Sequence, residues 1–499
     1  MDGHGSLIGL DVGTSGARAI AINASGVVLA TASEEYPLST PQPGWVEQDP
    51  GRWWVASQAV LKRVVAQVKE APLALGLTGQ MHGSVFLDSH DRVIRPALLW
   101  NDQRTTTQCR FITEKVGAGR LVEITGNPAL TGFQASKILW LRDHEPDAYS
   151  RIRRVLLPKD YIRLLLTGGY ATDPSDASGT LLLDLRSRNW SDELLDALEI
   201  QREWLPAVYE GPVVTGTITP QAAEATGLPS GLPVIAGGGD NAAAAVGNGI
   251  VRPGLVSSSI GTSGVVFAHT DRPVIDPSGR LHAFCHAVPD RYHVMGVTLS
   301  AGGSLRWWRD TLGAGLDYDA LSSIAEQAPP GSEGLLFLPY LSGERTPHMD
   351  PSARGSFFGL TLRHSLSHMT RAVFEGVAYS LLDCLDLVTG LGSPVAEVRA
   401  TGGGARSRLW RQLQADIFGL PIHRARIDEG PAFGAALLAS VAAGAYADVV
   451  EACTIIQVDP EPDLPDPGRH LLYQRYRGIY TDLYGATKPF MHGLAELSS

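Results

Sequence analysis

Two stretches of ten residues decide the fold: Leu7–Gly16, which reads LIGLDVGTSG, and Leu255–Gly264, which reads LVSSSIGTSG. In each, a run typical of a buried strand enters a Gly-Thr-Ser-Gly turn, and a second strand-like run follows. The two copies lie almost half of the 499-residue chain apart. Because the flanking pattern recurs together with the turn, we interpret the copies as the starts of two similar domains.

Outside these stretches the sequence alternates between strand-like and helix-like segments, which predicts an α/β fold. The Gly, Asn and Pro residues of Asn248–Gly254 (NGIVRPG) mark a turn between the halves. We therefore expect a first domain over residues 1–247, a second over 248–445, and a helical extension over 446–499 that packs on the second. The expected strands include Leu73–Leu77, Val155–Leu157, Val234–Ala236 and Val395–Ala400, and the expected helices include Trp53–Val68 and Ser365–Leu387.

The charge balance argues against nucleic acid and anionic membranes as partners. Lys and Arg number 41 against 52 Asp and Glu, which gives a formal net charge of −11. Binding to a phosphate-rich polymer requires a basic surface instead. The densest basic stretch contains Arg151, Arg153, Arg154 and Lys159, and its acidic neighbours indicate a solvated face. We expect no nucleic-acid partner.

Cysteine usage and the N-terminus predict a cytoplasmic protein. The four cysteines lie far apart, without CxxC or paired Cys/His spacing, and such usage is typical of a reducing compartment. Met1–Gly16 contains no Lys or Arg and therefore lacks the basic start of a secretory signal. The uncharged run Pro431–Ala447 is rich in Ala and Gly but poor in large apolar side chains, which predicts a close-packed helix and not a membrane span.

The two GTSG turns predict a phosphate site. Their backbone N–H groups and hydroxyls are the donors that phosphate oxygens require, so the two turns together would hold one polyphosphate between the domains. Asp11 lies two residues before Gly13 at the end of a buried strand, where a carboxylate is costly unless it binds a cation. We expect Mg²⁺ on a nucleotide; the alternative is that Asp11 accepts hydrogen bonds from the N–H groups of its own turn.

The segment Val234–Val246 (VIAGGGDNAAAAV) predicts a strand that breaks into three glycines before an Ala-rich helix. Gly237, Gly239 and Ala242 match the dinucleotide fingerprint GxGxxG/A, which leaves a dinucleotide-dependent oxidoreductase open as an alternative. The fingerprint also expects an acidic residue about 20 positions further on, which this sequence lacks, and Asp240 inside the turn would repel a pyrophosphate. In phosphoryl transfer the same carboxylate would accept the proton of a substrate hydroxyl, so we predict that Asp240 is the catalytic base.

Two further motifs offer groups to a ligand. The small residues of Thr401–Arg406 (TGGGAR) would let adenosine approach the backbone, although a plain strand-to-helix turn explains them equally well. Gly79–Gly83 (GQMHG) presents Gln80 and His82 to a small hydroxylated ligand, although a lone His is more often structural. The HAFCH stretch at 282–286 lacks a carboxylate or a second Cys and predicts no metal site. No Lys follows a Gly, so a P-loop kinase is excluded.

The order and spacing of these motifs resemble the FGGY family of carbohydrate kinases over nearly all of residues 6–490. The resemblance implies two actin-like (ribonuclease H-like) ATPase domains with the active site in the cleft between them. It also implies ATP and Mg²⁺ as cofactors, a small-molecule sugar as the other partner, and a homodimer. The further motifs that carry it are GWVEQDP (Gly44–Pro50), LWND (Leu99–Asp102), LLPKDY (Leu156–Tyr161), SDASGT (Ser175–Thr180) and LPYLSGERTPH (Leu338–His348).

The resemblance also assigns roles to single residues. It implies that Asp240 is the base and that Asp11 places Mg-ATP as a metal ligand. A family signature is kept over Gly355–Glu375, whereas the one around Gly132–His144 departs at Gln134, where Ser, Thr or Pro is usual, and we expect this departure to affect packing more than chemistry. The remaining assignments are Met81, His82 and Asn241 beside Asp240 for the sugar, Thr14, Ser15, Gly261 and Thr262 for phosphates, and Gly402, Gly403 and Ala405 for adenosine.

Within the family, the series of motifs is most similar to members that act on D-xylulose. This similarity implies transfer of the γ-phosphoryl group of ATP to O5 of D-xylulose, which gives D-xylulose 5-phosphate and ADP. L-Ribulose, a pentitol or glycerol is the alternative acceptor, because pocket shape decides which hydroxyl is recognised. An actin-like ATP-dependent binding module with a protein client is the alternative that is not an enzyme.

Overall fold

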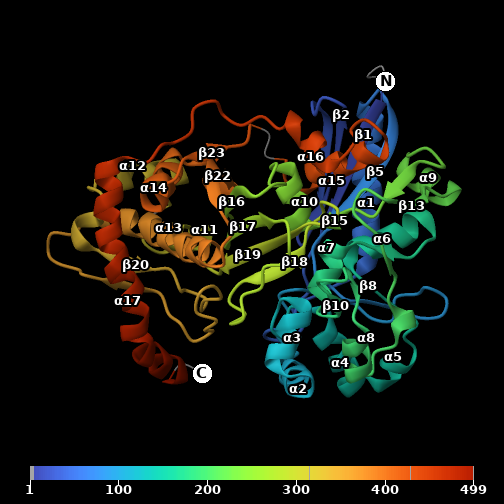
Figure 1. Ribbon diagram of the computed structural model, residues 1–499, viewed down its shortest axis with the longest axis horizontal. Coiled ribbons are helices and arrows are strands. Elements are labelled where there is room, and N and C mark those ends of the chain that lie inside the picture. Colours follow the sequence, from blue (N-terminus) through green and yellow to red (C-terminus); the bar gives the residue numbers. More distant parts are fainter. Residues whose placement is uncertain (1–4, 314, 427–428, 498–499) are drawn as a thin grey trace.

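The first GTSG turn joins two antiparallel strands inside a sheet. The structure, a computed structural model that describes residues 5–313, 315–426 and 429–497, has two lobes, each built around one sheet (Figure 1). In the first lobe three strands form an antiparallel meander, and a fourth pairs parallel with the first of them. The spatial order is β13 (Val214–Thr217), β14 (Pro233–Ile235), β5 (Ala71–Gly79), β1 (Gly5–Val12), β2 (Gly16–Asn23) and β3 (Val28–Glu35), with β15 (Gly238–Gly239) paired to β5.

The second sheet repeats this arrangement. Its spatial order is β18 (His282–Cys285), β19 (Tyr292–Thr298), β17 (Gly264–Thr270), β16 (Gly254–Ile260), β22 (Val395–Thr401) and β23 (Ile422–Arg424). The second GTSG turn joins β16 to β17, which pair antiparallel, and β22 pairs parallel with β16 as β5 does with β1. The repetition confirms the prediction of an α/β fold with two similar domains.

Helices cover both sheets, and short strands and helices fill the connections. In the first lobe the helices are α1 (Pro50–Gln67), α2 (Thr106–Val116), α3 (Ala118–Thr125), α4 (Gln134–His144), α5 (Pro146–Ser150), α6 (Pro158–Thr167), α7 (Pro174–Ala177), α8 (Asp192–Leu198), α9 (Pro220–Thr226) and α10 (Asp240–Gly247). Its short paired strands are β4 (Glu47–Gln48) with β7 (Ala97–Leu98), β6 (Val85–Leu87) with β8 (Arg154–Leu156), β9 (Ala171–Thr172) with β12 (Ala207–Val208), and β10 (Leu183–Asp184) with β11 (Asn189–Trp190).

The second half of the chain is similarly covered. Its helices are α11 (Gly302–Thr311), α12 (Tyr318–Glu326), α13 (Leu366–Gly390), α14 (Arg408–Phe418), α15 (Gly430–Ala442), α16 (Val449–Ala452) and α17 (Pro467–Leu497). A short pair of strands, β20 (Leu336–Leu338) and β21 (Ser356–Phe358), precedes α13. The 3₁₀ helices of the chain are η1 (Ser178–Thr180), η2 (Arg202–Trp204), η3 (Ser332–Gly334), η4 (Gly403–Arg406) and η5 (Cys453–Ile455).

Helix α1 illustrates how the sequence forms these elements. Asp49 caps the helix by accepting the N–H of Gly51 at 2.9 Å, and Pro50 occupies the first turn, where no N–H is needed. Trp53, Val60 and the other residues of one stripe are buried, because apolar residues recur every three or four positions. This stripe packs α1 against β2 and β3.

Helix α15 belongs to the second half of the sequence but packs on the first sheet (Figure 1). A Cβ added at Gly9 of β1 would lie 1.9 Å from the carbonyl oxygen of Ala432, and one at Gly76 of β5 would lie 2.0 Å from that of Ala435. Only glycine permits such close approach of a helix to a sheet. The prediction of a close-packed helix in this run is thus confirmed. None of the helices in the described ranges has the length and apolar content that a membrane span needs.

The last helices divide between the two lobes. Helix α17 packs against α14 and β20 of the second lobe, whereas α16 packs against α15 beside the first sheet. The four cysteines are buried as free thiols. The exact domain bounds stay a prediction.

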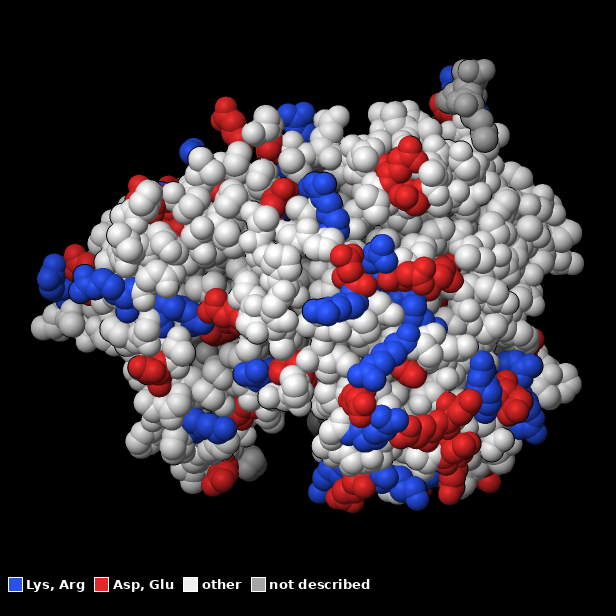
Figure 2. Space-filling view, viewed as in Figure 1, with Lys and Arg blue, Asp and Glu red and all other residues white. Residues whose placement is uncertain are grey.

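Charged residues of both signs are intermixed on the visible face of the first lobe (Figure 2). The interpretation of the basic stretch as a solvated face holds for Arg151 and Arg153, which are exposed. For Lys159 it is wrong, because its ammonium group is fully buried among three carboxylates. Sequence proximity to exposed arginines misled the interpretation, since Lys159 lies on α6, one element further along the chain.

Candidate active site

Asp240 begins α10 directly after the three glycines. Gly237 has φ of +78°, and a Cβ there would lie 1.8 Å from the carbonyl oxygen of Leu77, so glycine is required for the chain to turn against β5. The Oδ1 atom of Asp240 accepts hydrogen bonds from the backbone N–H of Asn241 at 2.7 Å and from its Nδ2 at 2.9 Å. Burial raises the pKa of Asp240 to about 6, although these two hydrogen bonds act in the opposite direction.

Asp11 lies near the end of β1, as its sequence position predicts. Its Oδ1 is buried and has no hydrogen-bond partner. Burial and the nearby carboxylate of Asp240 raise the pKa of Asp11 to about 7, and Arg18 on β2 partly opposes this rise. Asp11 and Asp240 therefore lie close enough together for the charge of Asp240 to affect the pKa of Asp11, and their shared role in the chemistry stays a prediction.

Hydrogen bonds within the first GTSG turn and from neighbouring side chains hold the turn in place. The N–H of Gly13 donates to the carbonyl of Gly16 at 3.0 Å, so it is used within the turn and is not uncovered as expected. Gln48 Nε2 donates to the carbonyl of Thr14 at 2.8 Å, and Trp100 Nε1 donates to the Thr14 hydroxyl at 2.9 Å. Ser15 at the tip is exposed.

The second GTSG turn lies against the start of α11. The N–H groups of Gly302 and Gly303 donate to the carbonyls of Gly261 and Thr262, each at 2.9 Å. A cavity of about 520 Å³ opens beside this turn. It is lined by the turn, α11, α12, η4 and aromatic side chains, and includes Gly261, Thr262, Leu305, Arg306, Tyr318, Ser322, Phe374, Gly403, Gly404 and Trp410.

This cavity is lined by three of the residues that the sequence predicts to contact the nucleotide, namely Gly261, Thr262 and Gly403. Gly402 and Ala405 do not: a Cβ on Gly402 would lie 2.9 Å from the carbonyl oxygen of Ile260, and Ala405 is buried beside a separate, smaller cavity. Contact of these two residues with a nucleotide stays a prediction. Sequence reasoning missed the aromatic wall of Tyr318, Phe374 and Trp410, because these residues come from α12, α13 and α14, which only the tertiary structure brings together.

Met81 lies next to Gly239, the residue that precedes Asp240, and His82 lies next to Gly179. A Cβ on Gly239 would lie 2.9 Å from Met81 Cγ, so the Met81 side chain covers this glycine. His82 adopts φ of +67°, and its Nδ1 forms a 2.6 Å hydrogen bond with the carbonyl of Gly179. Burial lowers the pKa of His82 to about 3, which keeps the imidazole neutral. The structure thus brings Met81 of the GQMHG loop next to the residue before Asp240, and contact of Met81 and His82 with a sugar stays a prediction.

The unusual Gln134 forms a hydrogen bond with the GQMHG loop. Its Nε2 donates to the carbonyl of Gly83 at 3.1 Å and to that of Leu156 at 3.3 Å. Three residues later on α4, Lys137 Nζ donates to the carbonyl of His82 at 2.8 Å. All three hydrogen bonds are to backbone carbonyls, so they help to fix the loop that carries Met81 and His82, which agrees with a packing role for Gln134.

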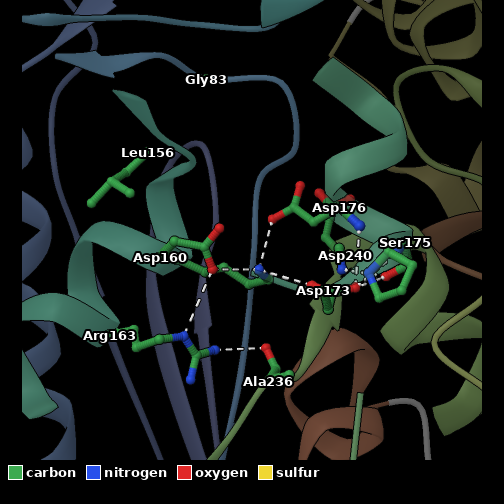
Figure 3. A network of polar contacts seen from close by, with 12 residues as sticks. Gly83, Leu156, Asp160, Arg163, Asp173, Ser175, Asp176, Ala236 and Asp240 are labelled. Atoms are coloured by element: carbon green, nitrogen blue, oxygen red, sulfur yellow. Dashed lines mark hydrogen bonds and ion pairs between the residues drawn. The ribbon is translucent and has the colours of Figure 1, made fainter. Parts of the chain in front are cut away.

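Two groups near the site were not found from the sequence. Arg345 in the second half of the chain is close enough to His82 for its charge to contribute to the low pKa of that imidazole. A buried cluster on α6 and α7, built on Asp160, Asp173 and Asp176, lies next to Asp240 (Figure 3). Arg345 belongs to the motif LPYLSGERTPH, Asp160 to LLPKDY and Asp176 to SDASGT, but only the tertiary structure shows what these residues contact.

The arrangement suits removal of a proton from a hydroxyl next to an anion site. Burial raises the pKa of Asp240 to about 6, and Met81 of the GQMHG loop covers the glycine directly before it. The glycines that matched a dinucleotide fingerprint are used otherwise. Gly238 and Gly239 form β15 on β5, and the N–H of Gly239 donates to Ser175 Oγ at 3.0 Å, so this N–H is not presented to a pyrophosphate.

Comparisons with known proteins identify the family of the chain. Residues 6–247 match the N-terminal domain and residues 256–443 the C-terminal domain of the FGGY family of carbohydrate kinases. The chain is 45% identical to the xylulose kinase of Escherichia coli (strain K12) over 97% of its own length and 99% of that protein.

Solved structures show the same likeness. A xyloylose kinase from Brucella ovis is 40% identical to this chain, with a TM-score of 0.92. The match covers 97% of this chain and 100% of that one. A gluconate kinase from Lactobacillus acidophilus is 30% identical with a TM-score of 0.91, over 97% of this chain and 98% of that one. These comparisons give no support to an oxidoreductase. The fold, the site and these matches together show that the chain belongs to the FGGY family of carbohydrate kinases and is an ATP-using sugar kinase.

Proposed function

We propose that this kinase transfers the γ-phosphoryl group of ATP to O5 of D-xylulose and releases D-xylulose 5-phosphate and ADP. The observation that carries the chemistry is Asp240, a carboxylate whose pKa burial raises to about 6 and which directly follows the glycine covered by Met81. The choice of sugar is supported by the xylulose kinase of Escherichia coli, which shares 45% of its residues with this chain.

In the proposed reaction Asp240 accepts the proton of the attacking hydroxyl. The two hydrogen bonds that its Oδ1 accepts from Asn241 fix the orientation of the carboxylate at the start of α10. Asn241, Met81 and His82 hold the sugar. Because the transition state of phosphoryl transfer is loose, most of the acceleration comes from alignment of the hydroxyl with phosphorus and from charge stabilisation.

The nucleotide is placed by the two turns and the cavity beside the second one. Thr14, Ser15, Gly261 and Thr262 contact phosphates in this proposal. Adenosine occupies the cavity of about 520 Å³, where Tyr318, Phe374 and Trp410 supply flat apolar surfaces against which a base can pack. We include Gly402, Gly403 and Ala405 in the adenosine site on the strength of the family motif.

Asp11 fits a divalent cation. Its buried Oδ1 has no hydrogen-bond partner, and a carboxylate oxygen is the ligand that Mg²⁺ prefers. We propose that Asp11 holds Mg²⁺ together with the phosphates of ATP. When bound, Mg²⁺ supplies neutralisation of the charge on the phosphoryl oxygens.

Asp11→Ala should raise the Mg²⁺ concentration needed for half-maximal activity by about tenfold, because Mg²⁺ sites in such enzymes use only one or two carboxylates. Initial rates across a Mg²⁺ titration at saturating ATP and sugar measure this. The exposed Asp196→Ala on α8 serves as the control and should leave the titration unchanged. An unchanged titration in the Asp11 variant would remove this residue from the metal site.

The choice of substrate is tested by ADP release over a panel of acceptors. The panel contains D-xylulose, L-ribulose, a pentitol, glycerol and gluconate, the last because a gluconate kinase shares the fold. We expect kcat/KM for D-xylulose to exceed that of the others by at least about tenfold, since a site built for one hydroxyl pattern leaves its own polar groups unpaired with another. A different preferred acceptor would correct the sugar, and no acceptor-dependent ADP release would contradict a sugar kinase.

We also propose that the enzyme acts in the cytoplasm as a homodimer. Four buried free thiols support a reducing compartment. Helix α17 exposes Leu471, Ile479, Phe490 and Leu494, which are apolar residues that a second copy would cover. Light scattering should give twice the chain mass of 53.2 kDa, and a monomeric mass would contradict the dimer.

A further inference from the structure

A buried ion cluster lies near the glycine turn that precedes Asp240 (Figure 3). Lys159 Nζ on α6 lies 2.6 Å from Asp160 Oδ1, 2.8 Å from Asp173 Oδ2 and 3.2 Å from Asp176 Oδ2. The four side chains are at most 1% exposed. Arg163, one turn further along α6, is also fully buried, and its Nε lies 3.8 Å from Asp160 Oδ1.

The charges of this cluster act on one another. Burial raises the pKa of Asp176 well above its usual range, Lys159 opposes this rise, and Asp160 and Asp173 add to it. Burial alone would lower the pKa of Lys159, but the three carboxyl groups outweigh it and raise that pKa. A buried ion pair adds little net stability by itself, so the cluster is better explained by the geometry that it imposes on its neighbours.

Ser175 links this cluster to the catalytic turn. Asp173 caps α7 and accepts the N–H of Ser175 at 2.8 Å through Oδ1, and the same oxygen accepts the Ser175 hydroxyl. The Ser175 Oγ in turn accepts the N–H of Gly239 at 3.0 Å. Gly239 directly precedes Asp240, so a continuous chain of contacts runs from Lys159 to the residue before the base.

Arg163 holds the other end of the same segment. Its Nη1 donates to the carbonyl of Ile235 and its Nη2 to the carbonyl of Ala236, both at 2.6 Å. The three glycines between these points restrict the backbone little by themselves. The segment from 235 to 239 is thus fixed from outside at both ends by side chains of α6 and α7.

We propose that Ser175, held by Asp173 and Lys159, is a positioning residue that fixes Asp240 in the place required for proton transfer. The inference rests on the proposed role of Asp240 as base. Ser175 acts through the backbone of Gly239 and contacts no substrate in this proposal. A displacement of about 1 Å at a reacting group costs on the order of 10²-fold in rate, so a loosened turn has a measurable consequence.

The first test compares Ser175→Ala with Ser178→Ala. Ser178 lies in the same SDASGT motif, is also buried, and its Oγ likewise accepts one backbone N–H, that of Cys285 at 3.1 Å. The two variants therefore remove equivalent hydroxyls, but only one of them touches the turn. Ser175→Ala should lower kcat by about tenfold or more, with KM for ATP within about twofold, whereas Ser178→Ala should keep kcat within about twofold.

The second test is a double-mutant cycle with Asp240→Asn. If Ser175 acts only through Asp240, Ser175→Ala should cost no further activity once the base is gone, so the double variant should match Asp240→Asn within about twofold. Thermal unfolding of all variants confirms that they are folded. If the alanine variant does not fold, Ser175→Cys takes its place, because sulfur fills the space but is a weak acceptor.

The outcomes separate this inference from the proposed function. Equal kcat for Ser175→Ala and Ser178→Ala, or the same loss from Ser175→Ala with and without Asp240, overturns the positioning role while the base role stands. Near-normal turnover of Asp240→Asn overturns the base role, and the positioning role with it.

Discussion

Asp240→Asn is expected to lower kcat by at least about 10²-fold, the contribution typical of a general base. Asparagine keeps the shape of the side chain, and its carbonyl oxygen still accepts the hydrogen bonds that Asp240 Oδ1 receives from Asn241. It does not accept a proton at neutral pH. Because the wild-type carboxyl has a pKa of about 6, it is mostly ionised at pH 7.5 and able to act as base.

Coupled ADP release at saturating substrates measures this loss. Titration calorimetry should show that ATP and sugar still bind, since the variant changes proton acceptance and not shape. Asp192→Asn is a matched control, because Asp192 lies at the start of α8 as Asp240 does at the start of α10, but is exposed and remote from the site. Turnover near the wild-type rate in Asp240→Asn would show that this carboxylate is not the base.

Lys159→Met should lower the free energy of unfolding by about 3–5 kcal/mol, the usual cost of removing one partner from a buried ion pair. The substitution leaves the carboxylates of Asp160 and Asp173 without the ammonium group that lies 2.6 and 2.8 Å from them. Methionine fills similar space but supplies no charge. Arg163, at 3.8 Å from Asp160, is too distant to replace it fully.

Urea unfolding followed by tryptophan fluorescence and circular dichroism measures the effect, with both probes needed because two lobes can unfold separately. Lys62→Met on α1 is the control. Lys62 is exposed, so its loss should change the free energy of unfolding by no more than about 0.5 kcal/mol. A loss below about 1 kcal/mol in Lys159→Met would mean that the protein relaxes or admits water around the carboxylates.

Several of the strands and helices could be predicted because their signals are local. The expected strand at Val395–Ala400 is β22, Val395–Thr401. The expected helix at Trp53–Val68 begins three residues after the start of α1 (Pro50–Gln67) and ends one residue after its end. The TGGGAR stretch was interpreted as a turn and is largely the 3₁₀ helix η4. Turn residues, caps and apolar periodicity act over a few positions, so they can be recognised without knowledge of the rest of the chain.

Part of the candidate site was equally visible. Asp11, Asp240 and the GQMHG loop each sit at the end of a strand-like run, and strands that pair side by side, such as β1 and β5, bring such ends together. The aromatic wall of the cavity beside the second GTSG turn and the effect of the Arg345 charge on the pKa of His82 were not visible. These depend on which helices and loops meet, and no residue spacing encodes that.

The sequence by itself determined the two strand-turn-strand repeats, the α/β class and the acidic residue after the glycines, because backbone turns and strand patterns are set by neighbouring residues. Only the tertiary structure decided that α15 crosses to the first sheet, that Lys159 is buried, and that Ser175 reaches the turn before Asp240. A side chain's burial and partners depend on segments up to hundreds of residues away. The same lysine is a solvated charge or a buried one according to what folds over it.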